Sequence, residues 1–193
     1  MGNLLLAADF QDAHIPGWKV YSWEKPAEFT QDNGIPEWCV TLPPSPDHMT
    51  AFLLATPGIL DDFDVCVSLR FLAGDKVNFF AGFDLRAGED GYYQVVMDAS
   101  GNFRAGWFEK TKWAGDLVKW TAHPSLRNGF DMRNTLRVLL HGTQMRIYLN
   151  GVLATSLHDS RFTAGKLRLF AATYELEMRL AVSNLQVREV RTV

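Results

Sequence analysis

Apolar and polar residues alternate with a period of two through most of this chain. In the segment 63–71, every odd position from Phe63 to Phe71 is apolar, while the even positions carry Asp, Cys, Ser and Arg. Successive side chains of a β-strand point to opposite faces, so this pattern predicts a strand with one buried and one polar face. The same alternation recurs in five further segments, 77–86, 92–98, 136–141, 144–149 and 180–190.

Turn residues separate these segments at regular intervals. Asn150–Gly151 predicts a two-residue hairpin, because a type I′ turn needs positive φ at both central residues. Gly101 predicts a tight turn, residues 123–131 predict a longer loop, and Ser183–Asn184 predicts an irregularity in the last strand. No stretch of ten or more residues shows an amphipathic helical pattern. A dozen or more short antiparallel strands therefore predict an all-β sandwich, jelly roll or barrel.

Composition and charge narrow the class of protein. The chain has 193 residues, of which 47% are hydrophobic, and this suits one self-sufficient domain over 1–193 rather than a disordered chain. A net charge of −3 argues against a nucleic-acid binder, and it fits an uncharged ligand such as a glycan better than a polyanion. The longest early apolar stretch, 4–8, is too short for a signal peptide or a membrane span, so the sequence as written predicts a cytoplasmic protein.

The sequence carries no familiar cofactor or metal motif. Cys39 and Cys66 lie in strand-like segments, and we expect buried thiols there rather than a disulfide. The five histidines are scattered, and no nucleophile elbow, zinc-protease or phosphate-loop motif occurs. We therefore expect no cofactor, and a structural calcium ion is the alternative. The oxygen donors near strand ends that would hold it are Asp9, Asp12, Asp61, Asp62 and Asn184.

Eight short segments follow one another in an order that resembles a known family. They are 9–12 with 17–18, 63–70, 91–97, 102–106, 135–138, 147–151, 162–167 and 182–187. Together they resemble bacterial concanavalin A-like jelly-roll modules, a group that includes family 16 glycoside hydrolase-like and laminin-G-like domains. The resemblance implies two packed antiparallel sheets, with a carbohydrate or protein ligand on the concave sheet face. Because these segments report turns and core, they predict the fold better than the activity.

The acid strand of the catalytic members is missing. Family 16 glycosidases carry a Glu-x-Asp-x-x-Glu strand, because retaining hydrolysis needs two carboxylates roughly 5–5.5 Å apart on one face. The nearest sequence here contains Glu175 and Glu177, and the third acid position is Leu180. We predict a solvated turn there, and another at the acidic cluster 61–64. No catalytic residue is assigned.

Tryptophans are the first candidates for ligand contact, since the C–H face of a pyranose packs on an aromatic ring. Four of the six are interpreted as scaffold or core, namely Trp18, Trp23, Trp38 and Trp120. Trp107 and Trp113 are candidate ligand residues, with packing under a loop as the alternative.

Polar positions of the central strands supply the other candidates. If the strands pair as the resemblance implies, one concave sheet surface carries Arg70, Asp84, Arg86, Gln94 and Glu109. The alternative is an ordinary hydrated face, on which Arg70 and Asp84 neutralise each other.

The sequence thus predicts a non-catalytic binding module for a carbohydrate. Two alternatives stay open. One is a glycoside hydrolase-like enzyme with an unfamiliar acid pair. The other is a protein-interaction or assembly module, which would show an exposed apolar patch around Trp107 and Trp113.

Overall fold

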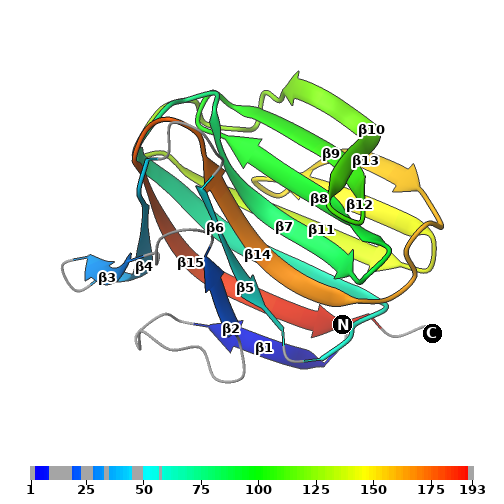
Figure 1. Cartoon of the computed structure of the whole chain (residues 1–193). Helices are drawn as coiled ribbons and strands as arrows, with labels where there is room; N and C mark the ends of the chain where they lie inside the picture. The colour runs from blue at the N-terminus through cyan, green and yellow to red at the C-terminus, as the bar shows by residue number, and fades with distance from the viewer. Residues whose placement is uncertain are drawn as a thin grey trace.

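Two antiparallel β-sheets make up the described part of the chain. The computed structural model describes residues 3–8, 19–22, 28–32, 35–44, 50–56 and 58–190. These residues form fifteen strands and no helix, and every strand pairing is antiparallel. Figure 1 shows the two sheets as two layers.

The larger sheet has eight strands. In spatial order they are β13 (Val152–His158), β12 (Gln144–Leu149), β11 (Arg133–His141), β6 (Phe63–Ala73), β15 (Met178–Glu189), β4 (Ile35–Leu42) and β3 (Glu28–Asp32), and β1 (Leu4–Ala8) also pairs with β15.

The smaller sheet has seven strands. In spatial order they are β10 (Lys112–Ala122), β9 (Asn102–Glu109), β8 (Gly91–Asp98), β7 (Phe79–Ala87), β14 (Lys166–Thr173), β5 (Thr50–Ala55) and β2 (Lys19–Ser22). Strands β7 to β10 follow one another both in sequence and in space, so tight turns connect them.

The main core lies between the two sheets. The five apolar residues of β6, from Phe63 to Phe71, are fully buried and belong to one cluster with residues of β7, β8 and β14. Removal of this apolar surface from water is the main force that holds the sheets face to face. The predicted alternation of β6 and the predicted antiparallel sandwich are confirmed.

The side of the seven-stranded sheet that faces away from this core is called its outer face here. All nine residues of β7 are buried, so its outward positions are covered as well as its inward ones. A second apolar cluster lies on the outer face and consists of Phe80, Val96, Phe170 and Ala172. The polar face that the alternation predicts is therefore interrupted by an apolar cluster on the central strands. Val77, predicted on the buried side, precedes β7 and is 58% exposed.

The predicted turns are confirmed. Asn150 and Gly151 have φ angles of 50° and 81°, as a type I′ turn requires. Gly101 has a φ angle of 85°, and the Asp98 carboxylate accepts two backbone N–H hydrogen bonds within the same turn. The pairing of β15 with β6 shifts register after Ser183, which is the predicted irregularity.

Cys39 and Cys66 do not form a disulfide with each other, as expected, and Cys39 is buried, but Cys66 is only partly buried. Some predictions lie outside the described residues, including the opening segment 9–12 with 17–18 and the core assignment of Trp23. In the part of the chain that the structure describes, no helix is long and apolar enough to span a bilayer.

Candidate ligand-binding site

A row of polar side chains crosses the outer face of the seven-stranded sheet. Arg168 on β14 lies opposite Asp84 on β7, and Asp84 lies opposite Gln94 on β8. The next residues along each strand point into the core, so strand alternation turns these three outward. Gln94 donates a hydrogen bond from Nε2 to Oδ1 of Asp84 at 2.9 Å, and Arg168 Nη2 lies 3.2 Å from Asp84 Oδ2.

Asp84 is the most enclosed member of this row, with a side chain only 2% exposed. Burial disfavours the charged carboxylate and raises the pKa of Asp84 to about 6, although Arg168 and Gln94 act in the opposite direction. The carboxylate is therefore ionised at neutral pH, and in that state it only accepts hydrogen bonds. The row offers a fixed anionic acceptor next to a cationic donor.

A cavity of about 430 Å³ opens over this row. Aromatic rings line it together with the polar groups, and they belong to Tyr92, Phe108 and Phe170. Tyr92 and Phe108 are cross-strand partners whose rings stack, with centroids 4.7 Å apart and planes 11° apart. The Arg168 guanidinium lies 4.4 Å from the centre of the Tyr92 ring. The cavity therefore combines a polar floor with flat apolar walls.

Arg104 on β9 extends the polar row toward the edge of the sheet. Its Nη2 donates a hydrogen bond to Oε1 of Gln94 at 3.3 Å. The guanidinium carbon lies 3.9 Å from the Trp113 ring centre, 5.1 Å from that of Trp120 and 5.7 Å from that of Phe80. Burial lowers the pKa of Arg104, but an arginine stays protonated in proteins. Cation–π contacts therefore hold a charged group on this face.

Gln94 has one amide orientation because it is held from both sides. Its nitrogen donates to Asp84, and its oxygen accepts from Arg104. Such a floor suits a polyhydroxylated ring. Hydroxyl groups hydrogen-bond to carboxylate, amide and guanidinium groups, and the C–H face of the ring packs on an aromatic wall.

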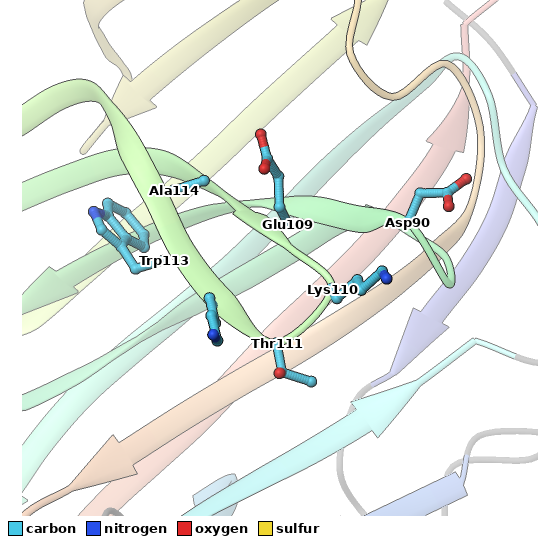
Figure 2. Close-up of a pocket in the computed structure, with 7 residues that line it drawn as sticks. Asp90, Glu109, Lys110, Thr111, Trp113 and Ala114 are labelled. Carbon is cyan, nitrogen blue, oxygen red and sulfur yellow. The ribbon is translucent and has the colours of Figure 1, made fainter.

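A second hollow of about 680 Å³ lies at the β9–β10 hairpin. Figure 2 shows Asp90, Glu109 and Trp113 spread around this hairpin rather than converging on one point. Its charged side chains, including Lys110, are exposed, and no buried polar group lines it. Lys110 and Thr111 also line the outer-face cavity of about 430 Å³, so this hairpin borders the main candidate site.

Three of the seven predicted ligand residues lie together on the outer face. Asp84 and Gln94 form the floor of the cavity, and Trp113 packs edge-on against Phe108 with ring centres 5.2 Å apart. Their role in ligand binding stays a prediction.

Arg70 does not belong to this site. It lies on β6 of the eight-stranded sheet, where it pairs with Glu37 and Asp131. The predicted neutralising pair of Arg70 and Asp84 is wrong, because the two residues lie in different sheets and Asp84 pairs with Arg168.

Arg86 is a buried structural residue at the end of β7. It has a φ angle of 52°, so its backbone departs from the regular strand and its side chain does not follow the alternation. Its guanidinium donates to the backbone carbonyls of Asp61, Gly142 and Phe162, and it pairs with the Asp62 carboxylate at 3.1 Å. The prediction that Arg86 lies on the ligand face is wrong, because these contacts tie loops together.

Trp107 and Glu109 lie on the opposite side of β9 from Arg104. Trp107 packs against the main core beneath the Arg161 guanidinium, which lies 3.9 Å from its ring centre. Glu109 is exposed at the end of the strand. Trp107 and Trp113 therefore face opposite sides of the sheet, and they do not form together the exposed apolar patch that a protein-interaction module would show.

The sequence pattern does not single out several residues of this site. Four of them line the cavity or extend its floor, and they are Tyr92, Arg104, Phe108 and Arg168. Trp120, interpreted as scaffold, is 40% exposed and packs against Phe80 on the outer face. The alternation of 92–98 places Tyr92 on the same strand face as Gln94, which is the one sequence signal for this group.

The turn predicted at Glu175 and Glu177 is confirmed, whereas the cluster 61–64 lies only partly in a turn, because Asp64 belongs to strand β6. Residues 174–177 form an exposed turn, and Asp61 and Asp62 precede β6. Asp62 and Asp64 pair with arginines. Within the described residues, no group of three metal-ligating side chains comes together.

No protein-family model matches the sequence, and a comparison with curated proteins finds no match. Solved structures do match. Carbohydrate-binding module CBM66 from Bacillus subtilis aligns with a TM-score of 0.65 and 16% identity, over 90% of this chain and 96% of its own. A Bacillus subtilis protein of unknown function with a galectin-like fold has a TM-score of 0.73 and 11% identity, over 99% and 98% of the two chains.

The catalytic domain of an endo-1,3-β-glucanase (laminarinase) from Thermotoga petrophila also matches, with a TM-score of 0.73 and 9% identity, over 100% of this chain and 99% of its own. The fold is a concanavalin A-like jelly roll. At these identities the likeness establishes the fold alone, which confirms the predicted architecture. A concanavalin A-like jelly roll hosts both binding and catalysis, so function has to be argued from the site.

Proposed function

We propose that this protein is a non-catalytic carbohydrate-binding module that holds a glycan in the outer-face cavity. The proposal rests on one observation. A single cavity of about 430 Å³ combines a row of polar side chains with a stacked pair of aromatic rings. Asp84, Gln94 and Arg168 supply the row, and Tyr92 with Phe108 supplies the rings. Small-molecule sites in proteins have this size and this mixture of apolar walls and few polar groups.

Each group has a defined role in this proposal. The Asp84 carboxylate accepts hydrogen bonds from sugar hydroxyls, and Arg168 donates to sugar oxygens. The rings of Tyr92 and Phe108 receive the C–H face of the sugar. Because the polar groups already hold one another, binding orders few side chains and loses little conformational entropy. The likeness of fold to a carbohydrate-binding module supports this function by analogy.

A glycan array followed by calorimetry tests the proposal. We expect saturable binding of at least one saccharide by the wild-type protein. The variants Tyr92→Ala and Gln94→Ala each remove a cavity contact, so each is expected to weaken binding by about tenfold or more.

The matched control is Tyr148→Ala on β12. The Tyr148 ring also lies beneath an arginine, with Arg137 at 5.0 Å from its centre, but it belongs to the other sheet. This control variant is expected to bind like the wild type. A wild-type protein that binds no saccharide, or an equal loss in Tyr148→Ala and Tyr92→Ala, would contradict the proposal.

Hydrolysis is the second candidate, and one observation favours it. Asp84 has a raised pKa, as a general acid requires, and Glu89 lines the same cavity. Turnover of chromogenic glycosides and polysaccharides is the assay. Activity that persists in the double variant Asp84→Asn with Glu89→Gln would exclude this acid pair.

A further inference from the structure

Arg104 differs from the other arginine of the outer face in having no acidic partner in contact. Arg168 is neutralised by Asp84 at 3.2 Å. Among the residues that the structure describes, no carboxylate reaches ion-pair distance of Arg104, and Asp116 on β10 acts on it only from longer range. Within the described residues, the charge of Arg104 is therefore not matched by a carboxylate in contact with it.

Aromatic rings take the place of that partner. The guanidinium carbon lies 3.9 Å from the ring centre of Trp113 and 5.1 Å from that of Trp120. Ring faces and one hydrogen bond to Gln94 offset part of the cost of taking a cation out of water. An anion in contact with the guanidinium would lower that cost further, because charge-assisted hydrogen bonds are the strong ones.

The guanidinium keeps a donor group for such an anion. Its Nη2 is engaged by Gln94, and its Nε is buried without a partner. Its Nη1 makes no hydrogen bond within the described part of the chain and, unlike Nε, is not completely buried. Nη1 therefore keeps two N–H donors that no group of the described chain uses.

A sugar ring has a surface to rest on beside this donor. Trp120 is 40% exposed and Tyr174 is 43% exposed. Both pack on Phe80, with ring centres 6.0 Å and 6.4 Å apart, so their positions are fixed by the outer apolar cluster. An acidic sugar would stack its C–H face on one ring and direct its carboxylate to Arg104.

We propose that the glycan recognised by this face includes a uronic acid unit, whose carboxylate binds Nη1 of Arg104 beside the Trp120 ring. This inference rests on the proposed carbohydrate-binding function and names the class of sugar. A uniformly charged polyanion is disfavoured, because Asp116 and Glu89 face the same region and the chain has a net charge of −3. The ligand is therefore a chain with sparse acidic units.

The experiment compares uronic acid polysaccharides with their own carboxyl-reduced forms. Xanthan and gellan serve as probes because their uronic acid units are sparse, each beside the same polymer with its carboxyl groups reduced to alcohols. We expect the wild-type protein to bind at least one acidic polymer about tenfold more tightly than its reduced form. Added salt is expected to shrink that difference, since it screens the charge contact.

Variants assign the preference to a residue. Arg104→Gln is expected to abolish the preference for the acidic form, while Arg104→Lys keeps the charge and part of the preference. Asp116→Asn removes the nearest repelling carboxylate and is expected to increase the preference, in a variant that leaves the ring contacts of Arg104 intact. The control is Arg146→Gln on β12, an exposed arginine of the other sheet, which is expected to leave the preference unchanged.

The outcomes separate this inference from the function on which it rests. Equal affinity for acidic and reduced polymers, or a preference that survives in Arg104→Gln, overturns the inference about the uronic acid. The proposed carbohydrate-binding function still stands in that case if Tyr92→Ala abolishes binding. A wild-type protein that binds no polymer in either form overturns both. Thermal unfolding of each variant verifies that it is folded, and Asp116→Asn still decides the question if Arg104→Gln does not fold.

Discussion

The indole of Trp113 occupies the space over Gly106 of the neighbouring strand, where any other residue would place its Cβ. On the other side of the same hairpin, the Trp107 ring covers Gly115 in the same way. On each face of the β9–β10 hairpin, a tryptophan ring of one strand therefore packs on a glycine of the other strand, and these two contacts fix the strands to each other. This arrangement holds Trp113 against the Arg104 guanidinium and explains why the two tryptophans face opposite sides.

Gly106→Ala is expected to destabilise the fold. The added methyl group would overlap both the Trp113 ring and the backbone carbonyl of Gly115, so the hairpin would have to shift. Overpacking of this kind costs about 1–3 kcal/mol, which urea denaturation measures as a lower free energy of unfolding. Gly58→Ala is the control, because no atom lies within 4 Å of the Cβ it would add. Equal destabilisation by the two substitutions would contradict the locking role.

Glycan affinity is expected to fall as the pH drops through about 6. Asp84 has a pKa of about 6, so acid converts it to a neutral group that no longer pairs with Arg168. Calorimetric titrations above and below this pH measure the change. Asp84→Asn is expected to bind weakly at every pH, and a wild-type affinity that is constant across pH 6 would be inconsistent with Asp84 as an acceptor for the sugar.

The contribution of Asp84 to folding stability is expected to change with pH in the opposite direction to its contribution to glycan affinity. Its pKa rises from 3.8 to about 6 on folding, so the folded state holds the proton over a range where the unfolded state has lost it. The contribution of Asp84 to the free energy of unfolding therefore decreases as the pH rises between these two values, and it is constant above them. Urea denaturation of the wild type and Asp84→Asn across this window tests the slope. Parallel curves for the two proteins would rule it out.

Local signals in the sequence are sufficient for the fold. The alternation of 63–71 becomes the buried face of β6, and Asn150–Gly151 becomes a turn with two positive φ angles. Both features depend only on residues that are neighbours in the sequence, so they can be predicted from this sequence alone.

The site is less predictable, because it depends on which strands pair. The alternating pattern predicts that Arg70 and Asp84 both point away from the core, but it does not indicate that they lie in different sheets. Arg168 joins Asp84 only through the register of β14 with β7. Irregular pairing of β10 with β9 changes the phase of alternation before Trp120, and the sequence carries no clear sign of it.

Cys66 is expected to react slowly with iodoacetamide in the folded protein. Burial and the nearby Asp64 carboxylate raise the pKa of the Cys66 thiol, so little reactive thiolate is present at mildly alkaline pH. Mass spectrometry of the adducts, with and without urea, measures the rate at each thiol, and Cys66→Ser identifies the peak. Alkylation of native Cys66 as fast as in urea would show that the thiol is accessible.

Arg86→Met is expected to lower the free energy of unfolding by about 3 kcal/mol or more without changing the glycan affinity of the folded protein. The methionine fills similar space but donates no hydrogen bond, so three backbone carbonyls and the Asp62 carboxylate lose their buried partner. Urea denaturation and calorimetry measure the two effects separately, and Arg146→Met provides an exposed arginine as the control. A variant with normal stability and weakened glycan binding would show that Arg86 contacts the ligand. Unchanged affinity at reduced stability would show that an arginine predicted on the sugar-binding face instead fastens the loops behind it.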